Sequence, residues 1–375
     1  MREALIDLDA IAHNTRALAR ACGRADLMAV VKADGFGHGG AAAARAALRN
    51  GASWLGVTSA TEAMALRDRG ITAPILMWLY VPDEDLSPVV RAGVDVSVPS
   101  VAHLTGVAAA SVRAGCPASV HLKVDTGLSR NGATLDEWPD LVRLARKHQQ
   151  EGTLAVRGIW SHLANAERPG DPSVDRQTAL FRAACRTAAE AGLEPSVRHL
   201  ANSAALLLRP ATRFDLARAG IALYGVEPVP GRSYGLRPAM TLRAEVMLTK
   251  RVPAGSAVSY GHDHHTDRPT TLALLPLGFA DGVPRSASGK GEVLIRGARC
   301  RIAGRVAMDQ IVVEAGDLPV VPGDVAVFFG PGDLGEPTVD DWAGWAGTNP
   351  HEILTGIGVR VPRRYRTAAG EQAAA

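Results

Sequence analysis

The sequence has few cysteines, no excess of one charge and no long hydrophobic run. Its four cysteines lie far apart, with no CxxC pair, at Cys22, Cys116, Cys185 and Cys300. This spacing indicates neither a disulfide framework nor a thiolate metal site. The 41 basic and 38 acidic residues leave a net charge of +3 that is spread along the chain, which does not indicate a nucleic-acid partner.

The sequence also contains no segment that is typical of a membrane span or of a secretion signal. No window approaches the roughly 18 consecutive apolar residues that a transmembrane helix needs. The opening MREALIDLDA carries Glu3, Asp7 and Asp9 where a secretion signal has a basic segment and then an apolar one. We therefore expect a cytoplasmic protein with no membrane partner.

The length and the hydrophobic content of the sequence indicate two globular domains. Of its 375 residues, 47% are hydrophobic and 21% are charged, which excludes a disordered or fibrous protein. The length exceeds what one hydrophobic core usually organises, although an α/β barrel alone can occupy about 250 residues.

Residues 10–228 show the alternation expected of a (β/α)8 barrel. Eight β-rich runs, several of them almost continuously apolar, are separated by stretches with helical spacing. The runs cover residues 27–32, 54–59, 74–80, 95–100, 119–125, 155–163, 196–201 and 215–225. This number and spacing favour a closed TIM barrel over an open doubly wound sheet.

The texture of the sequence changes at residue 229. Runs of Val, Leu, Ile and Thr, broken by Gly and Pro, predict a mainly β domain over residues 229–367. Residues 368–375 offer little to pack and are expected to be a disordered tail. The predicted fold class is therefore α/β, with a (β/α)8 TIM barrel followed by a mainly β C-terminal domain.

Polar side chains at the carboxyl ends of the barrel strands are the first candidates for chemistry, because barrel enzymes place their active sites there. Lys32 ends the first run, and a desolvated lysine suits carbonyl chemistry, although most such lysines extend into solvent. Arg218 lies inside an apolar run, where a guanidinium needs an anionic or acceptor partner. Lys123, Asp125 and Arg130 form either an internal ion-pair set or a site for a substrate carboxylate.

Other polar positions have a common structural alternative. A single strand-end histidine, such as His162 or His199, is more often structural than catalytic. The polar cluster at residues 262–265 is expected to be a solvated loop, so no metal site is predicted. Further candidate positions are Asn202, Ser203, Tyr260, Arg305, Met308 and Asp309.

Gly35, Gly37 and Gly40 form the G-x-G-x-x-G pattern between a β-rich run and a helix. A dinucleotide site of this type needs an acidic residue at the end of the next strand. That run ends at Ser59, and Glu62 already lies in the following helix. A phosphate cradle or a tight barrel loop therefore stays open as an alternative.

Taken in order, these segments resemble those of the alanine racemase family, pyridoxal 5'-phosphate enzymes with a barrel and a β domain. The matching segments are AVVKADGFGHG, HLKVDTGLSRNG, HLANSAA, ARAGIALYG, VSYG, GRVAMDQ and VRVPR. Their joint order and spacing are specific, and the likeness covers nearly the whole chain. The resemblance implies that residues 1–9 belong with the β domain. It also implies a homodimer in which the barrel of one subunit and the β domain of the other build each active site.

The resemblance implies an amino-acid substrate and a two-base mechanism. Lys32 would hold the cofactor and, once released, act as one base, while Tyr260 of the second subunit would act as the other. Racemisation requires bases on opposite faces of the α-carbon, because one face loses a proton while the other gains one. Arg218 would face the pyridine nitrogen, and since a guanidinium does not readily give up a proton, side reactions such as transamination would be limited.

The resemblance also implies the groups that surround the cofactor and the substrate. His162 would pack on the cofactor ring and connect Tyr260 to Arg218, with His199 behind it. Lys123 would match a lysine that carries a carbamate in many family members and steadies Arg130. Further implied cofactor contacts are Phe36, Asn202, Ser203, Gly220, Ile221 and Val359. The implied contacts of the substrate are Arg130, Met308 and Asp309.

Three departures from the family pattern each remove an aromatic hydroxyl. Phe36, Val359 and Phe279 stand where tyrosine is usual, and the first two tyrosines normally donate to the cofactor phosphate. Losing such bonds costs roughly 1.5–3 kcal/mol each, or at least tenfold in affinity per contact. We therefore expect weaker cofactor retention, and turnover of serine or a bulkier amino acid as good as that of alanine.

Three other classes of protein compete with a racemase. A non-racemising relative, decarboxylase-like or merely cofactor-binding, would keep Lys32, but related binding proteins lack the β domain and its tyrosine. A metal hydrolase with a carbamylated Lys123 would need an HxH pair on the first strand, which the sequence lacks. An NAD-dependent enzyme is the last alternative. Polar clusters at five separate strand ends fit the mouth of a barrel better than the crevice of a Rossmann fold.

Overall fold

A computed structural model describes residues 1–368 and 370–373 as two compact units. We call residues 12–35 and 40–236 the barrel unit, and residues 1–11, 36–39 and 237 onward the β unit. The segment 36–39 lies inside the predicted barrel but packs in the β unit, where the Nε of Arg363 donates to the carbonyl of Gly37 at 2.9 Å.

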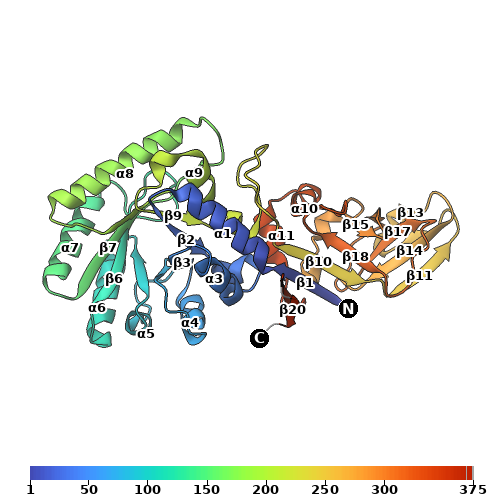
Figure 1. The fold of residues 1–375 in the computed structure, drawn as a ribbon, viewed down its shortest axis with the longest axis horizontal. Coiled ribbons are helices and arrows are strands. Elements are labelled where there is room, and N and C mark those ends of the chain that lie inside the picture. The colour runs from blue at the N-terminus through green and yellow to red at the C-terminus, as the bar shows by residue number, and fades with distance from the viewer. Residues whose placement is uncertain (369, 374–375) are drawn as a thin grey trace. The chain divides into compact units, whose positions relative to one another are not determined.

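The barrel unit is built on eight parallel strands, in the order β8-β7-β6-β5-β4-β3-β2-β9 (Figure 1). The strands are β2 (Asp26–Val30), β3 (Trp54–Val57), β4 (Ile75–Met77), β5 (Asp95–Val98), β6 (Ala118–Lys123), β7 (Leu154–Trp160), β8 (Val197–His199) and β9 (Leu216–Ala219). Backbone bonds from Asp215 to Arg198 and from Arg218 to Ala201, both 3.0 Å, join the two end strands. The predicted TIM barrel and all eight of its runs are confirmed.

Several predicted runs extend beyond their strands, and the largest excess is at the run 215–225. The run at 215–225 ends as a strand at Ala219, and Ile221–Tyr224 form a 3-10 turn, η2. Gly220 causes the change, because its backbone leaves the extended region (φ −111°, ψ −97°) and its N–H donates to the Ser203 hydroxyl instead of to a neighbouring strand.

Four helices of the barrel unit begin at a residue whose side chain caps them. Ser59, Ser100, Asp171 and Asn202 each accept a backbone N–H in the first turn of α4, α6, α8 and α9, which satisfies donors that have no partner inside the helix. The first 236 residues contain the helices α1 (Leu8–Cys22), α3 (Gly40–Leu48), α4 (Ala60–Asp68), α5 (Ser87–Arg91), α6 (Val101–Ala114), α7 (Trp138–Gln150), α8 (Pro172–Glu190) and α9 (Ser203–Leu208). A short 3-10 turn, η1, covers Pro210–Thr212.

The β unit is built on a ten-stranded sheet, in the order β11-β14-β17-β16-β15-β18-β10-β1-β19-β20, and a two-stranded one, β12-β13. The strands are β1 (Arg2–Asp7), β10 (Met240–Glu245), β11 (Leu248–Val252), β12 (Ala257–Val258), β13 (His264–His265), β14 (Thr270–Leu275), β15 (Glu292–Ile295), β16 (Ala298–Ile302), β17 (Ile311–Gly316), β18 (Val325–Phe329), β19 (Arg363–Thr367) and β20 (Gly370–Ala373). Buried and half-buried residues alternate along β10 and β17, as expected of strands with one face in a core. The mainly β domain is confirmed.

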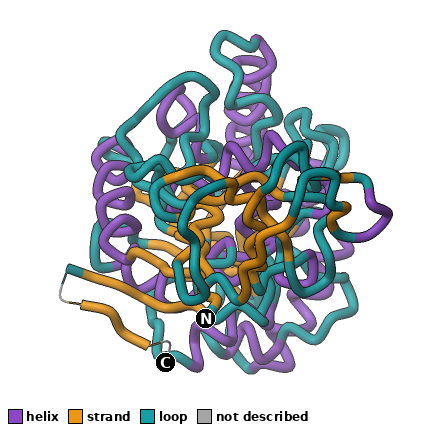
Figure 2. The backbone as a smooth tube through the Cα atoms, turned by 90° about the vertical axis from the view of Figure 1, so that its right-hand side faces the viewer, coloured by secondary structure: helices purple, strands orange, loops and turns teal. Residues whose placement is uncertain are grey.

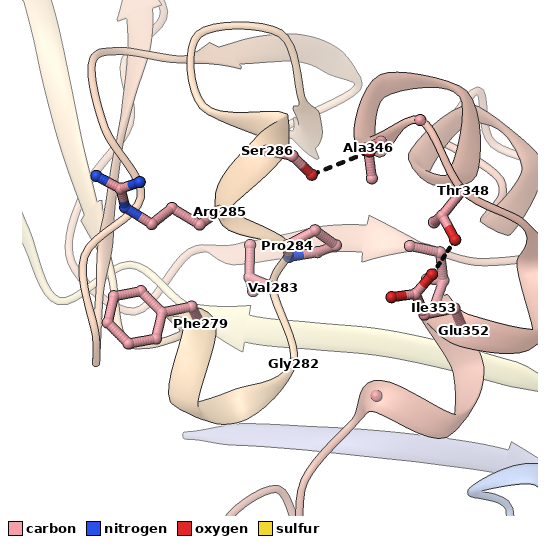
Figure 3. A pocket seen from close by; sticks show the side chains of 12 residues that line it. Phe279, Gly282, Val283, Pro284, Arg285, Ser286, Ala346, Thr348, Glu352 and Ile353 are labelled. Atoms are coloured by element: carbon pink, nitrogen blue, oxygen red, sulfur yellow. Dashed lines mark hydrogen bonds between the residues drawn. The ribbon is translucent and has the colours of Figure 1, made fainter.

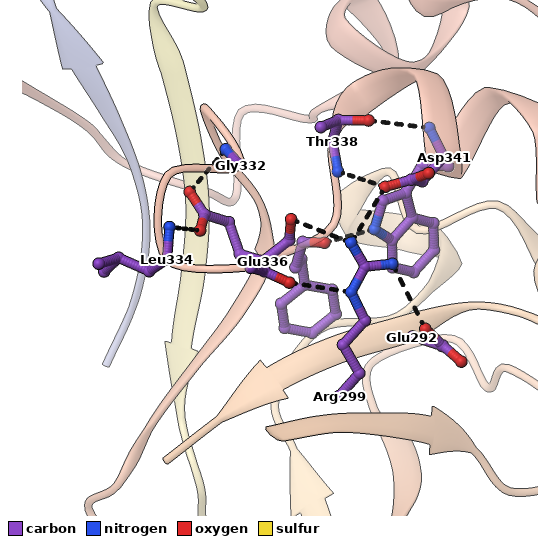
Figure 4. A network of polar contacts seen from close by, with 10 residues as sticks. Glu292, Arg299, Gly332, Leu334, Glu336, Thr338 and Asp341 are labelled. Carbon is purple, nitrogen blue, oxygen red and sulfur yellow. Dashed lines mark hydrogen bonds and ion pairs between the residues drawn. The ribbon is translucent and has the colours of Figure 1, made fainter. Parts of the chain in front are cut away.

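Two helices cover part of this unit, α10 (Val339–Ala346) and α11 (Pro350–Gly356). Arg299 of β16 anchors the start of α10, since its guanidinium lies 3.5 Å from both Glu292 and Asp341 (Figure 4). Thr338 and Asp341 form a reciprocal capping box there.

The predicted disordered tail is partly an ordered strand. Gly370–Ala373 form β20 and pair antiparallel with β19, in the segment that leads to the C-terminal mark in Figure 2. The edge of β19 offers unpaired backbone groups, and the tail supplies partners for them. Residues 369, 374 and 375 of the predicted tail lie outside the described residues. None of the helices in the described chain is long and apolar enough to cross a membrane.

Candidate active site

The carboxyl ends of the barrel strands bring the predicted polar residues of the barrel unit to one edge. Parallel strands end on the same side of a barrel, so residues far apart in sequence meet there. The residues at these ends are Lys32, Lys123, His162, His199, Asn202, Ser203, Gly220 and Ile221, with Arg218 one residue before the end of β9.

Arg218 is buried and held by four neutral acceptors. Its Nη2 donates to the carbonyls of Ser161 (2.8 Å) and Leu200 (3.0 Å) and lies 3.3 Å from Nδ1 of His162. Its Nη1 lies 3.0 Å from Nδ1 of His199. Burial lowers the pKa of this guanidinium to about 9, so it is charged at neutral pH. No carboxylate among the described residues lies within ion-pair distance of it, which leaves the charge available to a ligand.

The two histidines beside Arg218 are neutral. Burial, and then the positive charge of Arg218, hold the pKa of His162 and of His199 well below the usual value. The His199 ring also stacks on Trp160, with centroids 5.4 Å apart and planes 6° from parallel. A neutral imidazole can accept from the guanidinium, so both rings support Arg218 without repelling it.

Two lysines at this edge are pushed toward the neutral amine. Burial and then Arg130 lower the pKa of Lys32. Burial, Arg218 and Arg130 lower the pKa of Lys123 to about 7, and its Nζ lies 4.2 Å over the Trp160 ring. A neutral amine is the form that attacks a carbonyl carbon, so Lys32 has the character needed to hold an aldehyde cofactor.

The ion-pair alternative for Lys123, Asp125 and Arg130 is wrong in the described structure. Asp125 Oδ1 accepts the backbone N–H groups of Gly127, Leu128 and Ser129 at 2.8, 3.0 and 3.2 Å. In the ranges that the structure describes, this carboxylate forms no ion pair with either basic residue. Asp125 therefore shapes the loop that carries Arg130.

The segment after Lys32 is a left-handed turn, α2 (Lys32–Phe36), with φ of 51°, 50° and 63° at Ala33, Asp34 and Gly35. Non-glycine residues rarely adopt this conformation, and here two carboxylates hold it. Asp34 accepts from the Gly40 N–H and Glu62 accepts from the Ala33 N–H, both at 2.6 Å. Glu62 is therefore used inside the loop, and with a barrel in place of a doubly wound sheet the dinucleotide hypothesis is wrong.

The start of α9 and the turn after β9 bring polar donors together. Ser203 Oγ accepts from the Gly220 N–H at 2.9 Å, which leaves the hydroxyl hydrogen to donate to a ligand. Ile221 follows at the start of η2. The Asn202 side chain caps α9 by accepting from the Ala205 N–H at 3.0 Å, so its oxygen is already used. A hydroxyl and main-chain groups at helical turns suit a phosphate.

The β unit carries the other predicted site residues, and four of them are exposed: Tyr260, Met308, Asp309 and Val359. The exposed fraction is 71% for Tyr260, 55% for Met308 and 99% for Val359. Arg360 joins two of the segments, since it lies 2.6 Å from Asp309 and 3.1 Å from the buried Asp281.

Phe36 differs from these exposed residues because it is buried within the β unit. Its ring lies 5.9 Å from that of His351 in α11. The position that would hold a tyrosine hydroxyl in the family is therefore occupied by a packed apolar ring.

Tyr260 begins the 3-10 turn η3 (Tyr260–His262), directly after Ser259. Ser259 has φ of 64°, and its hydroxyl donates to the Arg305 carbonyl at 2.8 Å. Arg305 also forms an ion pair with Asp263, and His264 lies 3.3 Å from Glu314. These pairs use the polar groups of the segment to hold the turn that presents Tyr260.

A cavity of about 460 Å³ lies within the β unit (Figure 3). Phe279, Arg285, Ser286 and Glu352 are among its lining residues. Phe279, the third departure from the family pattern, is the first residue of the η4 turn (Phe279–Asp281), and it lines the cavity together with residues of η5 (Arg285–Ala287).

The sequence analysis did not identify two polar residues that belong to the hydrogen-bond network around Arg218 and His199. His121 in β6 and Asp95 at the start of β5 are buried in the barrel unit and connect to His199. The signal was present as polar residues inside apolar strands, in SVHLKVD and DVSV.

Comparison with known proteins extends this picture to the whole chain. The alanine racemase N-terminal domain matches residues 6–228, and the alanine racemase C-terminal domain matches residues 239–365. The chain belongs to the alanine racemase family. As a member of that family it is an isomerase, which overturns the metal-hydrolase and NAD-enzyme alternatives.

Individual relatives of the alanine racemase family match over nearly the full length. The alanine racemase of Salinispora arenicola is 56% identical over 364 residues, which are 97% of this chain and 98% of the relative. The structure of alanine racemase from D-cycloserine-producing Streptomyces lavendulae superposes with a TM-score of 0.95 at 48% identity, covering 97% of both chains. That of Bacillus anthracis alanine racemase with bound L-Ala-P gives 0.89 at 31% identity, covering 99% of this chain and 96% of the other.

Proposed function

We propose that the protein is a pyridoxal-phosphate-dependent amino-acid racemase that exchanges the α-proton between Lys32 and Tyr260. The observation that carries the proposal is Arg218, a buried cation with only neutral acceptors around it, at the strand ends where Lys32 also lies. A buried charge without an anionic partner is costly unless a ligand uses it. Family membership makes an amino acid the substrate class.

The donor set fits pyridoxal 5'-phosphate. Lys32 supplies an amine with a lowered pKa for an aldehyde, and Arg218 supplies a donor for a ring nitrogen. Ser203 and Ile221 supply donors for a phosphate, and the Gly220 N–H holds the Ser203 hydroxyl oxygen. Bound in this way, the cofactor would delocalise the negative charge left on the substrate when its α-proton is removed. His162, which is neutral, would pack on the ring.

Within this site the protein's own groups bind the substrate and move protons. Lys32 holds or releases a proton at Nζ, since burial and Arg130 lower its pKa and so make the proton easier to remove. Tyr260 does the same at its phenolic oxygen on the opposite face. Arg218 keeps its protons, so it would donate to the ring nitrogen without protonating it, which would limit transamination. Arg130, Met308 and Asp309 orient the substrate carboxylate.

Lys123 is proposed to carry a carbamate that steadies Arg130. Its pKa of about 7 gives a large fraction of free amine at neutral pH. The amine nitrogen would add to the carbon of CO2 and release one proton, which would replace a positive group beside Arg130 and Arg218 with a negative one. The resulting attraction is the reason that the modification would order the guanidinium.

The working unit is proposed to be a cytoplasmic homodimer with shared active sites. Tyr260, Met308 and Val359 are exposed in the single chain, as expected of residues that serve a second copy. All four cysteines are free, which suits a reducing compartment.

The test mixes two inactive variants, Lys32→Ala and Tyr260→Phe, after co-expression or controlled dissociation. Each should abolish inversion of L-alanine alone. In a shared-site dimer the mixed species regains one intact site, so roughly a quarter of the native activity should return in a statistical mixture. No recovery would place both bases in one chain. A cofactor absorbance band with no inversion of any amino acid by the native protein would favour a non-racemising relative.

A further inference from the structure

A continuous chain of hydrogen bonds crosses the interior of the barrel unit. From Arg218 Nη1 it passes to His199 Nδ1 (3.0 Å), from His199 Nε2 to His121 Nδ1 (2.8 Å), and from His121 Nε2 to Asp95 Oδ2 (3.0 Å). The two histidines are 0% exposed and Asp95 is 1% exposed. Asp95 ends the chain, and Arg157 Nη1 lies 3.2 Å from the same Asp95 oxygen.

The chain connects the two ends of the barrel. Asp95 is the first residue of β5, whereas His199 is the last residue of β8, so the acidic end lies at the amino side and the arginine end at the carboxyl side. Tryptophan rings surround the histidines, with Trp54 edge-on to His121 and Trp160 stacked on His199, both 5.4 Å between centroids. In such a dry environment each hydrogen bond is strong and each unpaired polar atom is costly.

The donors fix where every proton lies. Arginine can only donate, so Nδ1 of His199 is an acceptor and the proton of this neutral ring is on Nε2. That proton points at Nδ1 of His121, which must also be an acceptor, so the proton of His121 is on Nε2. The Asp95 carboxylate then accepts it. Both ends of the chain therefore require the same tautomer of both histidines.

Asp95 is what makes this arrangement preferable to its reverse. Without an acceptor at that end, His121 would bury an unpaired N–H, and the opposite tautomers would become competitive. In the reversed state the Nδ1–H of His199 would meet the N–H of Arg218, donor against donor, and the guanidinium would lose its support.

We propose that Asp95, at the end of the barrel away from Lys32, is a positioning residue that fixes Arg218 through His121 and His199. The inference rests on the proposed function, because Arg218 matters to turnover only if it supports the cofactor. Asp95 acts only through the histidines and is not itself a catalytic residue. Its ion pair with Arg157 is a separate contact, since Arg157 is half-exposed and donates nothing to His121.

The experiment compares Asp95→Ala with Arg157→Gln as a matched control. The control removes the ion pair but leaves the acceptor for His121. Two readouts are used: imidazole N–H resonances of histidine-labelled protein in water, measured without substrate, and steady-state kinetics of alanine racemisation with added cofactor. The native protein should show two slowly exchanging N–H protons, one from each buried histidine.

Asp95→Ala should lose both resonances and lower kcat by roughly tenfold, with KM changed by less than about twofold. Arg157→Gln should keep both resonances and native kcat. His121→Phe, which removes the acceptor of His199, should repeat the loss in kcat if the first variant does not fold. Retained resonances with native kcat in Asp95→Ala, native kcat in His121→Phe, or an equal effect in Arg157→Gln would overturn the proposal.

The outcome is distinguishable from failure of the proposed function. If the native protein inverts no amino acid, that function fails, and the N–H resonances still decide whether Asp95 fixes the two tautomers. If the native protein racemises alanine and the variants behave as native, only the role of Asp95 fails.

Discussion

The Nδ1 atom of His121 lies 2.8 Å from the Nε2 atom of His199, and both rings are fully buried inside the barrel unit. Gly158 makes room for this contact, because a Cβ at that position would lie 2.3 Å from Nδ1 of His121. His121 and Gly158 are paired in the β6–β7 ladder, next to a shift in its register. The contact between His121 and His199 in the core thus depends on the absence of a side chain at Gly158 in β7.

Gly158→Ala should destabilise the protein. The added methyl group meets a buried ring that has no free space to move into, and overpacking of this kind costs roughly 1–3 kcal/mol. Thermal unfolding followed by circular dichroism should show a midpoint lower by about 2–4 °C for each kcal/mol.

The matched control is Gly344→Ala in α10. This glycine is exposed and a Cβ there meets nothing within 4 Å. Alanine should stabilise the helix by about 0.5–1 kcal/mol, because glycine loses more backbone freedom on folding. An unchanged midpoint in Gly158→Ala would contradict the assignment of a steric role to Gly158.

Lys123 should make stability depend on pH. Its pKa is about 7 in the folded protein against 10.5 as the ordinary value, so between these limits the unfolded chain binds more protons than the folded one. The free energy of unfolding should therefore rise from pH 7 toward pH 10.5, by at most about 1.4 kcal/mol per pH unit from this group. Urea titrations at pH 7, 8 and 9 in CO2-free buffer measure the slope.

Lys123→Met should flatten this dependence, whereas Lys147→Met should not. Lys147 lies on α7 with 68% of its side chain exposed, so it controls for the loss of one positive charge. Equal slopes in the two variants would rule out a buried, largely neutral Lys123.

Phe36→Tyr combined with Val359→Tyr should slow the loss of cofactor on dialysis. Each change restores an aromatic hydroxyl at a position that the family uses for the phosphate, and each contact regained should improve affinity by at least roughly tenfold. Phe279→Tyr adds a hydroxyl at the cavity wall and should leave retention unchanged. Equal retention by the native protein and the double variant would show that other donors already satisfy the phosphate.

The native protein should turn over serine or a bulkier amino acid at least as well as alanine. Val359 is smaller than the tyrosine usual at that position, so it would crowd a substrate side chain less. Loss of α-deuterium from a panel of L-amino acids measures the preference, and Val359→Tyr should shift it toward alanine. A strict alanine preference of the native protein would be incompatible with this expectation.

Much of the fold was predictable, because strands that are buried on both faces consist of nearly continuous apolar residues. All eight barrel strands were located this way, and runs of Val, Leu, Ile and Thr indicated the mainly β character of the second unit. The error at 215–225 arose because Ile221, Leu223 and Tyr224 are apolar enough to resemble a strand, while the bond from Gly220 to Ser203 that ends β9 is a contact between distant segments. Strand β20 was missed because its pairing depends on an open edge of β19 and not on its own composition.

Local patterning and motifs in a fixed order were enough to identify the family, the fold class and the residue types at the strand ends. They could not decide how those residues interact. The sequence allowed an ion pair between Asp125 and Lys123, but Oδ1 of Asp125 instead accepts a hydrogen bond from the backbone of the following loop. Only the tertiary structure aligned Asp95, His121, His199 and Arg218, because hydrogen bonds between different strands depend on register and ring orientation, which no single segment encodes.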